Sequence, residues 1–146
     1  MKRFLLPLLL TAALILAACS TASASRESAK PSLELTRSDE QGAVTVNVTP
    51  LNLENPSDQL EFNVALDTHS VDLSMDLATL AKLTTDRGIT VQATLWDAPR
   101  GGHHVKGKLI FPATKDGSSL LEGANKITLT ISNVDTSSRI FEWELK

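Results

Sequence analysis

The chain of 146 residues contains one cysteine, Cys19, and several features that would indicate a function are missing. Because there is no second cysteine, no disulfide can form within one chain, and the fold must depend on its hydrophobic core. Acidic residues outnumber basic ones by 17 to 14, which argues against a nucleic-acid partner. A glycine-rich phosphate-binding loop is absent as well.

The N-terminus has the composition of a secretory signal peptide. Lys2 and Arg3 precede an uncharged apolar run that ends at Ala18 and is shorter than the roughly 20 residues of a membrane-spanning helix. The sequence Leu16-Ala17-Ala18-Cys19 resembles the lipobox of bacterial lipoproteins, which are cleaved before the cysteine. This resemblance implies that Cys19 carries acyl chains such as palmitate and that they anchor the protein to a membrane.

Three parts of the chain are expected. Residues 1–18 are the predicted signal peptide, residues 19–42 a lipidated N-terminus and flexible tether, and residues 43–146 a β-sandwich domain. The tether is rich in Ser, Ala and charged residues, which bury too little surface to fold. Leu33 and Leu35 alternate, which leaves a short edge strand open as an alternative there. Ser20 after the cysteine resembles the signal for the outer membrane in bacteria with two membranes. We therefore expect a location in the bacterial cell envelope, outside the cytoplasm.

From Ala43 onward, apolar residues alternate with polar ones, which is typical of β-strands. Turn signals at 54–58, 85–88, 98–102 and 115–119 separate the alternating runs. Asp76 is expected to cap a short helical turn over 77–80. The inward-facing sets are predicted to be Val44, Val46 and Val48; Leu60, Phe62, Val64 and Leu66; Ile89, Val91, Ala93 and Leu95; Leu109 and Phe111; Ile127, Leu129 and Ile131; and Phe141, Trp143 and Leu145.

Short strands with regular turns predict an all-β fold, an immunoglobulin-like antiparallel β-sandwich. The order of "LTTDRGITVQATLW", "GGHHVKGKLIFP", "KITLTISNV" and "FEWEL" resembles the immunoglobulin-like domains of small bacterial lipoproteins. The resemblance implies a sandwich with a binding role in the envelope, and it transfers no catalytic residue.

The three histidines fall in two segments, "LDTHSVDL" and "WDAPRGGHHVKG". The first contains a break in the alternation near Asp67–Ser70, which predicts a bulge or loop. If the two segments meet at one end of the sandwich, a ligand or metal site could form there, for which zinc and copper are the candidate ions. Its candidate residues are His69, His103, His104, Asp67 and Asp97.

Two interpretations of these residues remain open. In the first, one histidine packs on Trp96 and another bonds a loop carbonyl group; in the second, the histidines bind copper or zinc. Trp96 either lines a ligand pocket or packs in the core, and Trp143 is expected in the core.

No catalytic constellation is found in the sequence, so we expect no enzyme. Ser70 near His69 lacks the flanking glycines of a nucleophile elbow. The sequence predicts a membrane-anchored envelope lipoprotein that acts as a binding module for an envelope protein or small ligand. The alternative is a copper- or zinc-binding lipoprotein.

Overall fold

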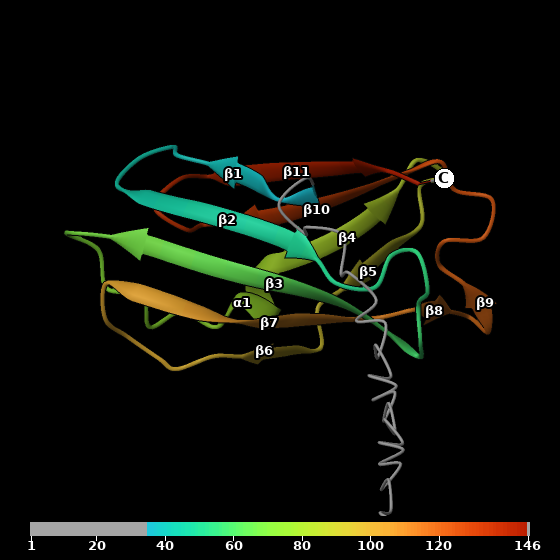
Figure 1. Cartoon of the computed structure of the whole chain (residues 1–146), viewed down its shortest axis with the longest axis horizontal. Helices are drawn as coiled ribbons and strands as arrows, with labels where there is room; N and C mark the ends of the chain where they lie inside the picture. The colour runs from blue at the N-terminus through green and yellow to red at the C-terminus, as the bar shows by residue number, and fades with distance from the viewer. Residues whose placement is uncertain (1–34, 146) are drawn as a thin grey trace, which may run out of the picture.

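The computed structural model describes residues 35–145, which form two antiparallel β-sheets packed face to face (Figure 1). The larger sheet has the strand order β1-β2-β3-β7-β6. Its strands are β1 (Arg37–Asp39), β2 (Val44–Pro50), β3 (Gln59–Thr68), β7 (His104–Pro112) and β6 (Leu95–Asp97).

The second sheet has the strand order β11-β10-β4-β5. Its strands are β11 (Ser138–Glu144), β10 (Lys126–Ser132), β4 (Ala81–Thr85) and β5 (Thr90–Gln92). Two further strands, β8 (Thr114–Lys115) and β9 (Ser118–Ser119), form a small hairpin of their own. The helical turn α1 (Leu77–Leu80) lies between β3 and β4 in the chain, and its N-cap is Asp76, as predicted.

The order of the strands confirms the predicted immunoglobulin-like sandwich. The neighbours β2-β3-β7-β6 correspond to strands A, B, E and D of that fold, and β11-β10-β4-β5 correspond to G, F, C and C′. Strand β1 is an addition, paired with β2 at the edge of the larger sheet. It reverses the direction of the chain before the first strand of the standard fold.

The core lies between the two sheets and comes from the inward positions of each strand, because successive side chains of a strand point to opposite faces. Phe62 packs edge-to-face on Phe111, and its ring centroid lies 5.5 Å from that of Trp143, which the sequence also predicted to be buried. Aromatic pairs of this kind add to the free energy gained by burying their apolar surface.

One alternating run, residues 89–95, was interpreted wrongly as a single strand. It forms β5 in one sheet and β6 in the other, and the chain crosses between the sheets at Ala93–Thr94. After the crossing, the core lies on the other side of the chain. Leu95 is therefore exposed and its neighbour Trp96 is buried.

The folded part also begins earlier than Ala43. Strand β1 lies inside the segment 19–42 that was expected to be a tether, and Trp143 Nε1 donates a 2.6 Å hydrogen bond to the Leu35 carbonyl oxygen. Arg37 Nε, on β1, donates to the Glu142 carbonyl oxygen of β11 at 3.1 Å. These bonds hold β1 against the edge of the other sheet.

Candidate functional site

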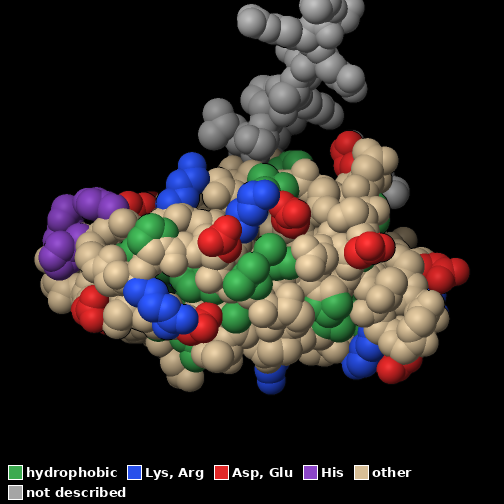
Figure 2. Space-filling model, turned by 90° about the horizontal axis from the view of Figure 1, so that it is seen from below, with side chains coloured by type: hydrophobic (Ala, Val, Ile, Leu, Met, Phe, Trp, Pro, Cys, Tyr) green, Lys and Arg blue, Asp and Glu red, His purple; other side chains and the backbone are tan. Residues whose placement is uncertain are grey.

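The histidines lie at one end of the sandwich, which we call the histidine end: residues 67–73 and 98–104. Figure 2 shows the histidine side chains gathered at one extremity of the molecule. Strand β3 ends at Thr68, where the predicted break in the alternation occurs. Its hydroxyl group donates to the Ala43 carbonyl oxygen at 2.7 Å and accepts hydrogen bonds from the amides of Ser70 and Val71, so the turn that carries His69 is held by a buried side chain.

Backbone hydrogen bonds join the two histidine-bearing segments. The Thr68 amide donates to the His103 carbonyl oxygen at 2.9 Å, and Leu73 exchanges two bonds with Gly101 and Gly102. Both glycines have positive φ, +82° and +98°, a conformation that side chains with a Cβ rarely adopt. The glycine pair therefore lets the 98–104 segment turn back against the 67–73 segment.

Asp67 and His104 are directly opposite each other on β3 and β7. His104 Nδ1 lies 2.7 Å from Asp67 Oδ1, on the solvent face of the larger sheet. An ionised carboxylate can only accept, so Nδ1–H of the ring is the donor. In the neutral ring this tautomer leaves Nε2 with a free lone pair.

His69 lies beside this pair. Its ring centroid is 6.3 Å from that of His104, and the two rings are nearly perpendicular, with an interplanar angle of 86°. All three side chains are accessible, because His69 is exposed and the side chains of His104 and Asp67 are 69% and 47% exposed. The structure thus brings together Asp67, His69 and His104.

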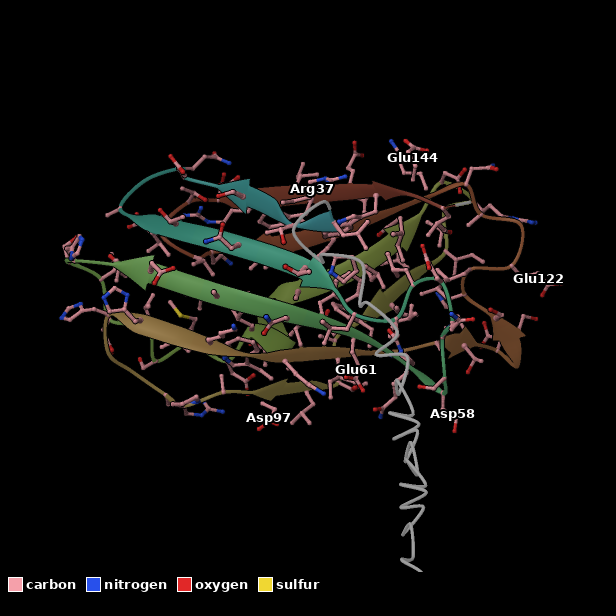
Figure 3. The ribbon with its side chains drawn as sticks, in the orientation of Figure 1. Arg37, Asp58, Glu61, Asp97, Glu122 and Glu144 are labelled. Atoms are coloured by element: carbon pink, nitrogen blue, oxygen red, sulfur yellow. The ribbon has the colours of Figure 1, made fainter. Side chains whose placement is uncertain are left out.

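The other predicted site residues do not join this group. Asp97 pairs in register with Lys108, four residues along β7 from His104, and Figure 3 shows it on β6. Trp96 is 7% exposed and belongs to the core, so it lines no ligand surface. His103 is exposed at the start of β7, and its backbone holds the turn. Within residues 35–145, no group of three or more His, Cys, Asp or Glu side chains is arranged to hold a metal ion.

Two ordinary surface ion pairs lie nearby, one on this face of the sheet and one between a loop and the helix cap. Lys108 Nζ lies 2.8 Å from Glu61 Oε2, and this hydrogen bond, with the charges of Glu61 and Asp97, raises the pKa of the Lys108 ammonium group. The guanidinium group of Arg100 lies 3.0 Å from Asp76 Oδ2, so it ties the 98–104 segment to the helix cap.

Two hollows lie elsewhere on the described surface. One of about 470 Å³ runs between β1 and β11 and is lined by residues that include Arg37, Ile140 and Glu144. The other, of about 370 Å³, lies between Arg87 and the β8–β9 hairpin. Neither is lined by a histidine.

The chain enters the domain away from the histidines, beside the far half of β2. Arg37 pairs with Val48, whereas Thr68 pairs with Val44, so β1 starts toward the far end of β2. In Figure 1, β3 points to one end of the sandwich and β11 points to the other, where the C-terminus lies. The bond from Trp143 to Leu35 places the first described residue on the side toward that second end, which we call the entry end.

Comparisons with known proteins assign no function. No family model and no curated protein match the chain. A DUF4426 family protein from Pseudomonas aeruginosa has a similar structure, with 11% sequence identity and a TM-score of 0.43 over 73% of this chain and 92% of that one. This likeness is too low to transfer a ligand or an activity.

The predicted signal peptide and lipidation site, including Cys19, lie outside the described residues. Between Leu35 and Leu145 no helix is long and apolar enough to cross a membrane. Sequence reasoning missed one buried polar group, Arg139, which has no exposed surface and which binds the turn after β1. The signal was available: Arg139 occupies an inward position of β11, in phase with Phe141 and Trp143.

Proposed function

We propose that the protein is a lipid-anchored lipoprotein of the bacterial cell envelope whose immunoglobulin-like domain is a binding module. Its ligand site, in this proposal, is the histidine end. The observation that carries the proposal is a separation: the described chain starts beside the far half of β2, and Asp67, His69 and His104 lie at the other end of that strand. A tether attached at Cys19 would therefore present the histidines away from the membrane.

The fold supports this arrangement. The connections that correspond to the B–C and F–G loops, residues 69–80 and 133–137, lie at the same end of the sandwich as the histidines. In antibody variable domains, loops at this end form the binding site. The added strand β1 supports the orientation, because without it the tether would reach β2 at the histidine end.

The anchor is tested by replacing Cys19 with Ala. Wild-type protein is expected in the membrane fraction and the Cys19→Ala variant in the soluble fraction, because a variant without acyl chains loses its membrane affinity. Metabolic labelling with a palmitate analogue should mark the wild type alone. Wild type without label, or a variant that stays in the membrane fraction, would contradict the anchor.

The binding surface is tested by photo-crosslinking in the cell envelope. A photoreactive residue is placed at Ser70, which is exposed at the histidine end, or at Ser118, which is exposed at the entry end. A discrete crosslinked product is expected from position 70 and not from position 118. Equal yields from the two positions, or no product from position 70, would overturn the proposed surface.

A further inference from the structure

We propose that His69 and His104 together bind one divalent transition-metal ion, copper(II) or zinc(II), and that Asp67 is a positioning residue for His104. This inference rests on the proposed function, because it names the chemistry of the ligand at the histidine end. The proposal takes two imidazole nitrogens as the protein's metal ligands. The sequence had offered five candidate residues for a metal or ligand site.

The strongest observation is the Asp67–His104 pair. Metal-binding histidines usually donate their second ring N–H to a carboxylate or carbonyl oxygen, which fixes the tautomer and makes the free nitrogen a better donor. The 2.7 Å bond between His104 Nδ1 and Asp67 Oδ1 supplies this arrangement before any metal is bound. His104 Nε2 is the atom left to bind the ion.

The distance to His69 fits a shared ion. Imidazole nitrogens bind zinc at about 2.0–2.1 Å, which places the centroids of two rings on one ion about 5–6 Å apart. The observed separation of 6.3 Å requires only a small movement of one exposed side chain. Because His69 follows the Thr68 turn, its backbone is held while the ring can rotate.

The choice of metal follows from the donors. Imidazole nitrogens suit zinc and copper, whereas magnesium and calcium prefer a shell made of oxygen donors, and the two proposed donors here are nitrogens. The order of divalent affinities predicts tighter binding of copper(II) than of zinc(II). Since two side chains do not complete a coordination shell, the remaining positions are open to water or to a donor atom of a partner molecule.

The site is distinct from a general clustering of histidines. His103 is adjacent to His104 in the chain, but it belongs to the turn before β7, which begins at His104. No ring contact or hydrogen bond links its side chain to Asp67, His69 or His104 among the described residues. His103 is therefore the matched control: a third exposed histidine at the same end that lies outside the proposed pair.

The test is titration of the full chain in detergent micelles with copper(II) or zinc(II) chloride, followed by calorimetry. Cys19→Ser is the background, so that no thiol competes for the ion. One ion per chain is expected, with copper(II) the tighter. His69→Ala and His104→Ala should each weaken copper(II) binding by at least about 30-fold, whereas His103→Ala should change it by less than about threefold. Magnesium chloride should give no binding.

The role of Asp67 has its own readouts. In the metal-free protein, nitrogen NMR of the His104 ring should show the Nδ1–H tautomer, and this tautomer should be lost in Asp67→Ala. The same variant should bind copper(II) about 10- to 100-fold more weakly, which is the usual effect of removing such a partner. An unchanged tautomer or unchanged affinity would overturn the assignment of Asp67.

Other outcomes overturn the metal site itself. These are more than one ion per chain, equal losses in all three histidine variants, or no loss in the His69 and His104 variants. Circular dichroism melting of each variant confirms that the fold is retained. A failed titration with a crosslink from position 70 would remove the metal and leave the binding module. A successful titration with no crosslink from position 70 would keep the metal site and remove the binding module.

Discussion

The Arg139 guanidinium group is completely buried, and its Nη1 lies 2.5 Å from Asp39 Oδ1. The same group donates to the carbonyl oxygens of Val134, Asp39 and Gln41, at 2.6 to 3.2 Å. Asp39 belongs to β1 and Arg139 to β11, so this ion pair joins the added strand to the opposite sheet. Together with the bonds from Trp143 to Leu35 and from Arg37 to Glu142, it holds β1 in place.

Asp39→Ala is expected to lower the free energy of unfolding by about 3–5 kcal/mol, because it leaves a buried charge without its counter-ion. Urea unfolding followed by tryptophan fluorescence measures the change. The matched control is Glu61→Ala, which removes the half-buried partner of the exposed Lys108 in a surface ion pair. Exposed ion pairs contribute about 0–1 kcal/mol, so this variant should change little. Equal effects in the two variants would contradict the role of the buried pair.

The same pair predicts how stability depends on pH. Burial alone raises the pKa of the Asp39 carboxyl group, but hydrogen bonds from Gln41 and the charge of Arg139 outweigh it and lower the pKa below its usual value of 3.8. A group whose pKa is lower in the folded state binds a proton more readily when unfolded. Its stabilisation is therefore full above the unfolded pKa and is lost as the pH falls through the folded pKa.

The measurement is the difference in unfolding free energy between wild type and Asp39→Ala, taken from pH 7 down to pH 3. The difference should be constant near neutral pH and should shrink below about pH 4. Asp86 and Glu142 also have lowered pKa values, from hydrogen bonds to Asn125 and Lys126 respectively. Wild type and Asp39→Ala both keep these two residues, so their effect cancels in the difference. A difference that grows toward acid pH would refute the sign of this coupling.

The sequence was sufficient to predict the strands whose alternation runs unbroken, such as β3 and β10, and the cap of α1 at Asp76. Period two and turn residues are local signals, so they identify a sandwich without knowledge of contacts. The break after Asp67 also had a local signal, and it correctly placed the loop that carries His69.

The errors arose where a long-range contact decides the structure. The crossing from β5 to β6 keeps an apolar pattern on both sides, so the run up to Leu95 looked like one strand. Strand β1 has a polar sequence, and it is ordered by Arg139 about 100 residues later. Asp97 is the last residue of a strand that runs toward the histidine end but stops opposite Lys108, four residues short of His104, a placement that only the register of β6 against β7 reveals.

A close approach of two backbones at Gly107 gives a further prediction. A Cβ built there would lie 2.2 Å from the Asp97 carbonyl oxygen and 2.4 Å from the Ala98 Cβ, so Gly107→Ala must push β6 away from β7. We expect a loss of at least about 2 kcal/mol in unfolding free energy, as in overpacked cores. Lys106→Ala, at the exposed position just before Gly107, should change the unfolding free energy by less than about 0.5 kcal/mol. Similar values for the two variants would contradict the clash.

The last prediction concerns where the domain begins. A fragment of residues 43–146 lacks β1, whereas a fragment of residues 35–146 keeps it. In the shorter fragment the guanidinium of Arg139 retains the Val134 carbonyl oxygen but loses its acceptors on Asp39 and Gln41. We expect the shorter fragment to be less stable by about 3–5 kcal/mol, since a buried charge loses its partner.

Arg139→Met distinguishes the loss of the ion pair from a general loss of surface contacts. In the 35–146 fragment this substitution removes a partnered arginine and leaves Asp39 without its cation, so it should destabilise. In the 43–146 fragment it removes an arginine that has lost its carboxylate, and an apolar side chain of similar length should stabilise. Urea unfolding of the two fragments, each with and without Arg139→Met, gives the sign of the change in unfolding free energy for each fragment. Destabilisation of both fragments by Arg139→Met would show that β1 contributes through contacts other than its bonds to Arg139.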